Sequence, residues 1–310
     1  MPPFDKNIPL KKFCNLLNFP ADRLPDGFLE KFNAINTNYR TMGKEDIEKY
    51  LMVVLDLINS PYIKRNRVEN LKAWEHGWNE NLESFKIDFS EEHLKPKYFR
   101  PCNFFRFDKT VVVPENTNIE YELFLAVRHL VFHKYFREFD SIYELGCGSC
   151  QNIFALAKLF PEKEIFGLDW TNSSKQIADI LSKKLYMNIK GLHFDFMKPP
   201  KDLAIGPNSL IYSIHSLEQL GAKHESLLRF LLKQKPKLVV NYEPLVELYQ
   251  QDNLYDSLAV MYSKNRNYLS NYLTELRKLA QLGKIEILEE LRPFIGGIYH
   301  EASLIVWRPV

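Results

Sequence analysis

The 310-residue chain has few cysteines and no long apolar run. Four cysteines do not make a disulfide scaffold at this length. No segment approaches the ~20 consecutive apolar residues that span a bilayer, and the N-terminus lacks the apolar stretch of a secretory signal. These absences lead us to expect a cytoplasmic protein without a membrane partner.

The chain also lacks a charge of one sign, because 41 basic residues face 39 acidic ones and leave a net charge of +2. Such a balance gives no reason to expect nucleic acid as a partner. Aromatic residues are plentiful at 14 %. A Phe-rich core explains them most simply, and an aromatic-lined pocket is the alternative.

The sequence pattern changes near residue 140, and there are no internal repeats. Before that point we expect mainly helices. Residues 45–58 carry apolar side chains at helical spacing. Thr117 and Glu120 match the pattern of a capping box, which predicts the start of another helix. Residues 99–114 are expected to form a loop with one short strand.

Beyond residue 140, short apolar runs alternate with helical stretches. Strands are predicted at 141–145, 164–168, 191–194, 209–214 and 237–240. Helices are predicted at 152–160, 173–187 and 224–233, with one long helix within 245–282. This alternation indicates a parallel sheet with helices on both faces. Two final strands, 284–292 and 302–308, are joined through Gly296 and Gly297 without room for a helix, so we expect them to pair antiparallel.

A glycine loop, Gly146-Cys147-Gly148-Ser149-Cys150, follows the first of these strands. In an open parallel sheet, ligands bind at the carboxyl ends of the strands. Glycines there let a ligand approach the backbone. A dinucleotide fingerprint would need a third glycine where the chain has Gln151. Glu144, two positions before the loop, would repel a pyrophosphate but suits a ligand that carries an amine and a sulfonium.

Two more carboxylates follow the next two strands. Asp169 ends the second strand, where a carboxylate can accept hydrogen bonds from ribose hydroxyls. Asp195 ends the third strand and is followed by Phe196, a pair that suits the amino group and ring face of an adenine. Three carboxylates at successive strand ends are a stronger indication of a ligand site than any one motif.

Residues 140–310 therefore resemble the class I S-adenosylmethionine-dependent methyltransferases of the small-molecule type. That family begins with an acidic-hydrophobic-GxGxG loop, which Glu144-Leu145-Gly146-Cys147-Gly148 matches, with Cys150 in place of the third glycine. The resemblance implies an α/β fold: a Rossmann-like, mostly parallel seven-stranded sheet with an antiparallel last strand.

The resemblance also implies the cofactor, S-adenosyl-L-methionine, with S-adenosyl-L-homocysteine as its product. The loop residues Gly146, Cys147 and Gly148 would pack along the methionine part. Asp169 would hold the ribose, with Trp170 against the adenine. Asp195 would bind the adenine amino group and Phe196 would flank it.

On this basis we divide the chain into two regions. Residues 140–310 are the cofactor-binding methyltransferase domain, and residues 1–139 are a mainly helical cap that recognises the substrate. Trp74 and Trp78 belong to an unusual aromatic and polar cluster in the cap. They either anchor a helix on the catalytic domain or close over the ligand, which would exclude water from the reaction.

The fourth strand is followed by His215 and Glu218. His215 is the candidate general base because imidazole titrates near physiological pH, although it could instead only pack over the cofactor. Glu218 could orient His215, act itself or cap the following segment. Glu243, Tyr299 and His300 follow later strands and are candidates for the acceptor pocket.

The expected acceptor is a small molecule, with a hydroxyl of a sugar or secondary metabolite as the methylated group. The Asn/Asp-Pro-Pro-aromatic sequence of nucleic-acid amino-methyltransferases does not follow the fourth strand. Cys147 and Cys150 have no second cysteine pair, so we expect no metal. The alternatives are a protein or peptide methyltransferase, or a cofactor-binding protein without chemistry.

Overall fold

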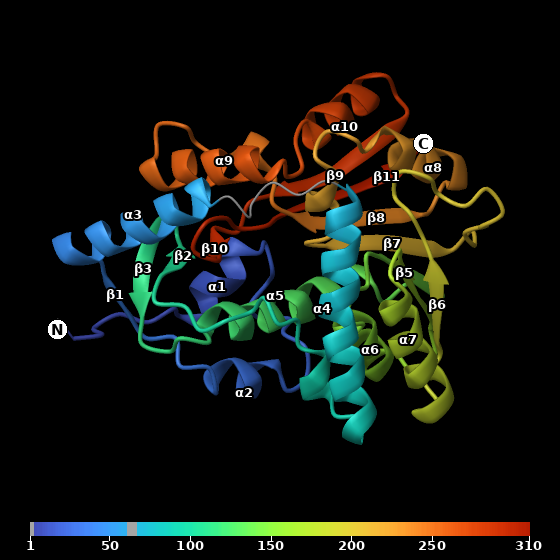
Figure 1. The fold of residues 1–310 in the computed structure, drawn as a ribbon, viewed down its shortest axis with the longest axis horizontal. Coiled ribbons are helices and arrows are strands. Elements are labelled where there is room, and N and C mark those ends of the chain that lie inside the picture. Colours follow the sequence, from blue (N-terminus) through green and yellow to red (C-terminus); the bar gives the residue numbers. More distant parts are fainter. Residues whose placement is uncertain (1–2, 61–66) are drawn as a thin grey trace.

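The computed structural model describes residues 3–60 and 67–310, and its larger sheet has seven strands (Figure 1). These strands are β4 (Ser141–Leu145), β5 (Glu164–Asp169), β6 (Ile189–His193), β7 (Ser209–Ile214), β8 (Leu238–Glu243), β9 (Ile285–Leu291) and β11 (Ser303–Pro309). Their order is β6-β5-β4-β7-β8-β11-β9. The first five pair in parallel, and β11 runs antiparallel to both β8 and β9. The predicted Rossmann-like sheet and its antiparallel last strand are confirmed.

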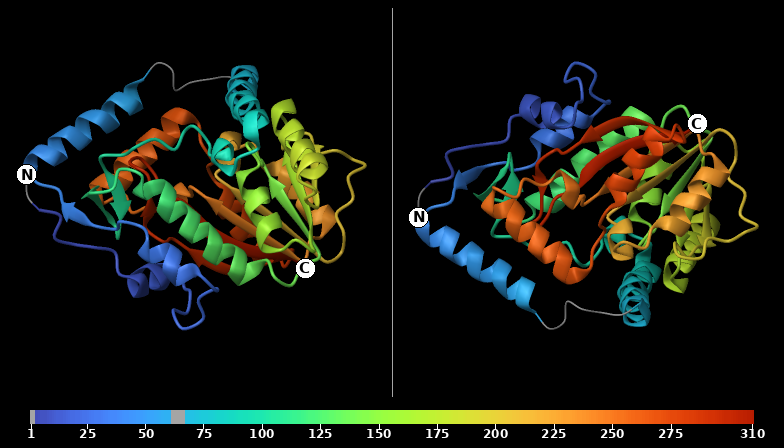
Figure 2. Two further views of the ribbon diagram at one scale, coloured as in Figure 1. Left: turned by 90° about the horizontal axis from the view of Figure 1, so that it is seen from below. Right: turned by 90° about the horizontal axis from the view of Figure 1, so that it is seen from above.

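Helices cover both faces of this sheet, as the views from below and above show (Figure 2). They are α6 (Gln151–Leu159), α7 (Asn172–Lys184), α8 (Glu225–Gln234) and α10 (Tyr272–Gln281), with α5 (Ile119–Tyr135) from the N-terminal part. Helix α9 (Leu254–Arg266) packs instead against α3 (Lys44–Asn59). Successive strand residues point to opposite faces. Ile142 accordingly packs in the core cluster of α5, α6 and α7, whereas Tyr143 packs in that of α8 and α10.

The N-terminal part contributes more helices and most of a second sheet. The helices are α1 (Leu10–Leu16), α2 (Phe28–Asn33), α3 (Lys44–Asn59) and α4 (Arg67–Asp88). Three strands, β1 (Tyr39–Thr41), β2 (Phe105–Phe107) and β3 (Thr110–Pro114), join β10 (Ile295–Gly296) in the antiparallel order β1-β3-β2-β10. Short 3-10 turns are η2 (Glu91–Leu94), η3 (Leu217–Leu220) and η4 (Val246–Leu248). No helix within residues 3–60 and 67–310 combines the length and apolar character needed to cross a bilayer.

Three local predictions are wrong. Residues 99–114 hold two strands, β2 and β3, rather than one. The helical stretch after residue 245 is two helices, because Asn267 adopts a left-handed conformation that ends α9. The capping box is absent: α5 begins at Ile119 after Asn118, and no side chain caps it. The Glu120 carboxylate instead lies against Gly297, where an added Cβ would approach its Oε1 to 2.5 Å.

β9 and β11 pair antiparallel as predicted, but the segment between them reaches into the second sheet. Its β10 pairs with β2, so the chain after β9 crosses to the N-terminal part and returns. A buried ion cluster lies at this crossing. Arg106 of β2 pairs with Asp256 of α9 and with Glu301, and Arg292 pairs with the same two carboxylates.

Candidate active site

The glycine loop after β4 is held in a conformation that requires glycine. Gly146 has a φ of 74° and Gly148 a φ of 50°, values that side chains disfavour. Space is also lacking: an added Cβ would lie 2.4 Å from Ser216 Cβ at the first position and 2.7 Å from Trp78 at the second. Both glycines are therefore required by the backbone and by their neighbours.

Cys150 stands where the related loop has its third glycine, and it keeps the left-handed conformation, with a φ of 64°. Its Sγ is buried and donates to the Ser174 carbonyl oxygen over 3.3 Å. This contact offsets part of the cost of a non-glycine residue there. Cys150 therefore takes the place of the third glycine at the residue before α6, without changing the left-handed conformation there.

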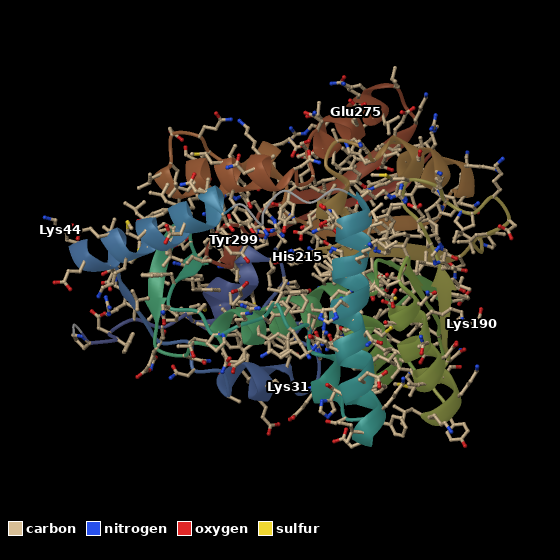
Figure 3. The ribbon with its side chains drawn as sticks, in the orientation of Figure 1. Lys31, Lys44, Lys190, His215, Glu275 and Tyr299 are labelled. Carbon is tan, nitrogen blue, oxygen red and sulfur yellow. The ribbon has the colours of Figure 1, made fainter. Side chains whose placement is uncertain are left out.

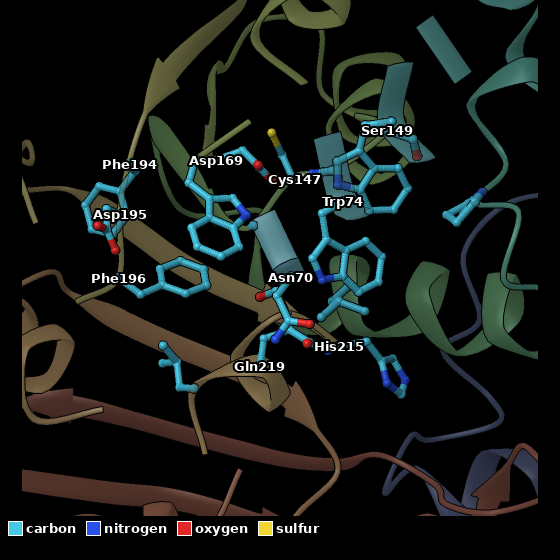
Figure 4. A pocket seen from close by; sticks show the side chains of 18 of the residues that line it. Asn70, Trp74, Cys147, Ser149, Asp169, Phe194, Asp195, Phe196, His215 and Gln219 are labelled. Carbon is cyan, nitrogen blue, oxygen red and sulfur yellow. Dashed lines mark hydrogen bonds between the residues drawn. The ribbon is translucent and has the colours of Figure 1, made fainter. Parts of the chain in front are cut away.

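The loop forms one wall of a cavity of about 330 Å³ at the carboxyl ends of the parallel strands (Figure 4). The predicted residues that line it are Gly146, Cys147, Gly148, Asp169, Trp170, Asp195, Phe196 and His215. In the close-up, Asp195 and Phe196 lie at one end of the cavity and His215 at the other, with Cys147 and Trp74 between them. The cavity is therefore long enough to present separate ends to different parts of a ligand.

Asp169 and Asp195 are already hydrogen-bonded in this arrangement. Asp169 is 7 % exposed, and its carboxylate accepts the N–H groups of Gly148 and Thr171, each over 2.9 Å. Burial raises the pKa of Asp169 even though these donors oppose it. Asp195 accepts from Arg67, whose guanidinium also lies over the Trp170 ring. Both carboxylates keep free lone pairs that a ligand hydroxyl or amine can use.

Glu144 lies beneath the cavity rather than in its wall. Its Oε1 accepts from Asn152 Nδ2 over 2.7 Å, and Asn152 itself lines the cavity. Its buried Oε2 has no hydrogen-bond partner among the described residues. Burial raises the pKa of Glu144 to about 8. A cationic group in the cavity would favour the ionised carboxylate, and Asn152 would connect the two.

Helix α4 covers the cavity. Arg67, Asn70, Trp74 and Trp78 all line it, and the two indole rings stack with centroids 5.3 Å apart. Glu75 fixes the helix by accepting the N–H groups at the start of α7. The spacing of three, four and four residues places these four side chains on one helical face. The sequence contains this spacing, but Arg67 and Asn70 carry no motif that would mark them beside the two tryptophans.

His215 lines the cavity beyond the end of β7, with a φ of 51°. Glu218 Oε2 lies 3.8 Å from His215 Nδ1 and 3.6 Å from His300 Nε2. The His300 ring centroid is 5.9 Å from that of His215 and 4.9 Å from that of Tyr299. Figure 3 labels His215 and Tyr299 close together in the middle of the molecule.

The residues predicted for the acceptor pocket thus lie close together, but several of them contact other protein groups instead of the cavity. Glu218, Glu243, Tyr299 and His300 lie behind His215 and do not line the cavity. Glu243 accepts the N–H groups of Ser216 and Leu217, over 3.1 and 3.2 Å, and so holds the loop that carries His215. Tyr299 stacks on Tyr262 with ring centroids 4.3 Å apart.

This group of side chains favours a protonated His215. Burial alone would lower the pKa of His215, but the neighbouring carboxylates, Glu218 first, outweigh burial and raise it. Burial would raise the pKa of Glu218, and His215 and His300 outweigh burial and lower it. Burial also raises the pKa of Glu243 to about 7 and lowers that of His300 to about 4.

Glu120 is a further member of this group that the sequence did not reveal. Its carboxylate forms no hydrogen bond or ion pair with the described residues, and it contributes to the raised pKa of His215. Burial raises the pKa of Glu120 to about 7. Gly297 has the space for this carboxylate only because it lacks a Cβ. In the sequence, the only signal of this space is the pair Gly296-Gly297, which predicts only the connection between the last two strands.

Within the described ranges, no group of three or more His, Cys, Asp or Glu side chains is arranged to hold a metal ion. The Sγ atoms of Cys147 and Cys150 are 4.0 Å apart, and both thiols are free and buried.

Comparison with known proteins gives only structural similarities. No protein-family model matches the chain, and no curated protein matches it. A SAM-dependent methyltransferase from Aquifex aeolicus is 15 % identical, with 59 % of this chain and 89 % of that one covered and a TM-score of 0.43. A geranyl diphosphate methyltransferase in complex with GPP and sinefungin is 12 % identical, with coverages of 77 % and 97 % and a TM-score of 0.47. The O-methyltransferase of a trans-AT PKS multienzyme of Brevibacillus brevis is 13 % identical, with coverages of 58 % and 70 % and a TM-score of 0.42.

The order of the seven strands, the reversed direction of β11 and the glycine loop after β4 give this chain the Rossmann-like α/β fold that its sequence resemblance to the class I S-adenosylmethionine-dependent methyltransferases implies.

Proposed function

We propose that the protein transfers a methyl group from S-adenosylmethionine to a small-molecule acceptor, with a hydroxyl as the methylated group. The observation that carries the proposal is the cavity itself. The glycine loop, Asp169 and Asp195 come from three successive strand ends and face one space of about 330 Å³. The cofactor, when bound, supplies an electrophilic methyl group on its sulfonium.

The residues fit each part of this cofactor. The loop backbone leaves room that a Cβ would fill. Asp169 would accept hydrogen bonds from the ribose hydroxyls. Asp195 would accept a hydrogen bond from the adenine amino group and keep its ion pair with Arg67. Trp170 and Phe196 offer apolar surfaces for the adenine ring. Glu144, through Asn152, would balance the positive end of the methionine part.

The acceptor end would use His215 to remove a proton. A hydroxyl placed between His215 and the methionine end of the cavity would lose its proton to the imidazole as the oxygen takes the methyl group. Helix α4 would exclude water from this step, since its two tryptophans cover the cavity. Residues 1–139 would then act as the cap of a methyltransferase domain spanning 140–310.

Asp169→Asn is expected to weaken cofactor binding by roughly tenfold to 100-fold, the usual loss for a hydrogen bond to a charged group. The NH₂ group of the new amide would also face an N–H group that now donates a hydrogen bond to Asp169. Isothermal titration with S-adenosylmethionine measures the change. Asp179→Asn, on the exposed side of α7, is the matched control and should bind like the parent. No binding by the parent at millimolar cofactor would refute the proposal.

Turnover is expected to rise with pH through a pKa above the ordinary 6.5 of histidine, because His215 must be neutral to accept a proton and its pKa is raised. Glu218→Gln removes the first neighbour that raises it, so the rising limb should move to lower pH. His215→Ala should lower kcat by about 100-fold. A rising limb that stays in place in Glu218→Gln would show that another group titrates.

The acceptor class can be tested with methyl-labelled cofactor and a fractionated lysate. Label in the low-mass fraction supports a small-molecule acceptor. Label in the polymer fraction would favour a protein or peptide acceptor, and tight cofactor binding without any transfer would favour a protein that only binds the cofactor.

A further inference from the structure

A second cavity, of about 410 Å³, lies between α2, η2, α5 and α6. None of the residues that line it lines the first cavity. In the view of Figure 3, Lys31 of α2 marks its side of the molecule below α5, while His215 lies above that helix. The second cavity is therefore separate from the site described above.

Arg128 of α5 lines this cavity and is buried, with 8 % of its surface exposed. Its Nη1 donates to Asn152 Oδ1 over 3.0 Å, and its guanidinium lies near the rings of Phe124 and Phe132. Within residues 3–60 and 67–310, no carboxylate forms an ion pair with it. Burial lowers the pKa of Arg128, and the more distant Glu91 and Glu144 only partly oppose this. Buried charges in proteins are normally paired, because desolvation of an unpaired charge is costly.

The rest of the cavity wall carries charges of both signs and apolar surface. Two carboxylates, Glu91 and Glu122, line it, and Glu122 accepts from Asn116 Nδ2 over 2.7 Å. Lys31 and Lys158 line it, and Lys158 is already paired with Glu91 over 2.9 Å. His129 also lines it, and its buried Nε2 has no hydrogen-bond partner among the described residues. The apolar part of the wall comes from α2, the segment after it, α5 and α6, and includes Phe28, Phe32, Ile35, Leu125, Phe132 and Leu159.

From these contacts we infer that the second cavity binds a small organic carboxylate with an apolar body. The carboxylate pairs with the Arg128 guanidinium, which has donors left over in a planar fork. Lys31 lies on the same wall and adds to the attraction for an anion. Burial lowers the pKa of His129 to about 4, so its neutral imidazole can offer a hydrogen bond but no charge. The apolar body fills the phenylalanine-lined part, and the volume suits an aromatic ring or a short chain.

The bound carboxylate would also affect the first cavity, because Asn152 connects the two. Asn152 accepts from Arg128 and donates to Glu144, which lies beneath the cofactor cavity. An anion on Arg128 weakens the positive field that helps Glu144 to ionise. This part of the inference rests on the proposed function: the carboxylate should weaken binding of S-adenosylmethionine by about fivefold or more, and the cofactor should weaken carboxylate binding by the same factor.

The test uses the full chain with benzoate as the probe. Benzyl alcohol is the control ligand, because it has the same ring but no charge. Titration followed by ¹H–¹⁵N NMR should show benzoate binding at least about tenfold more tightly than benzyl alcohol, the difference expected for a charged hydrogen-bonded pair. Ala155→Trp fills the cavity from α6 without touching the charge, and it should abolish benzoate binding while cofactor affinity stays unchanged. Arg128→Gln should remove the preference for benzoate over benzyl alcohol.

Equal binding of the two probes, or unchanged benzoate binding in Ala155→Trp, would overturn the inference. So would the absence of benzoate binding at about 10 mM in a parent protein that binds the cofactor. Cofactor affinity that does not change in saturating benzoate would overturn the connection through Asn152. A parent protein that binds benzoate but no cofactor would instead refute the proposed function.

Discussion

Gly146→Ala is expected to reduce affinity for S-adenosylmethionine by at least about 100-fold and to destabilise the protein. The added Cβ would lie 2.4 Å from Ser216 Cβ and 3.3 Å from Phe196 Cζ. Ser216 cannot easily move, because its Oγ donates to the Leu145 carbonyl oxygen and its N–H donates to Glu243. Overpacking of this kind typically costs about 1–3 kcal/mol, and the left-handed backbone adds about 1–2 kcal/mol for a non-glycine residue.

Gly283→Ala is the matched control for this variant. Gly283 has a φ of 65°, close to that of Gly146, but an added Cβ there would meet nothing within 4 Å. It therefore carries the backbone strain without the clash, and the difference between the two variants isolates the contact with Ser216. Urea unfolding and cofactor titration measure both effects. Equal stability of the two variants would show that the strand ends adjust, and unchanged cofactor affinity would place the ligand away from the loop.

The end of the cavity at Asp169 and Asp195 could be predicted from sequence because it depends on local features that repeat. Asp169 and Asp195 each follow a strand of a parallel sheet, and the carboxyl ends of such strands lie at one edge. Once the alternation of strands and helices was recognised, their meeting with Gly146 followed without knowledge of any long-range contact. The antiparallel pairing of the last two strands followed in the same way.

The end of the cavity at His215 could not be predicted to the same degree, because side chains there have partners far away in sequence. Glu243 satisfies the N–H groups of the loop that carries His215. Glu120 matches a capping box by its sequence, but its carboxylate lies in a space left by Gly297. A local pattern cannot show that a distant glycine has made that space available.

The second sheet was missed for a similar reason. Its strands are two to five residues long, and β10 comes from the other end of the chain. Two residues of β10 pair with Phe107 and Arg106 of β2. Periodicity cannot detect a strand of two residues. The crossing of β10 places Arg106 near Glu301, which directly follows the candidate pocket residue His300.

Arg106→Met is expected to lower the free energy of unfolding by about 3–5 kcal/mol, a large share of the total for a folded domain. Arg106 is 3 % exposed and pairs with both Glu301 and Asp256. Methionine keeps an unbranched apolar stem but is shorter and has no charge. The two buried carboxylates would then have Arg292 as their remaining partner in this cluster. Removing one partner of a buried ion cluster leaves charge uncompensated, which costs more than the intact cluster contributes.

Arg277→Met is the matched control, because Arg277 pairs with Glu290 at a site about half exposed. An exposed pair of this kind contributes less than about 1 kcal/mol. Urea unfolding of the two variants at neutral pH compares the buried cluster with a surface pair in the same protein. A loss of about 1 kcal/mol or less in Arg106→Met would mean that the methionine packs well enough to replace the charge. A loss near the expected value would show that the β2–β10 crossing stabilises the whole chain, since the cluster joins β2, α9 and the segment between β9 and β11.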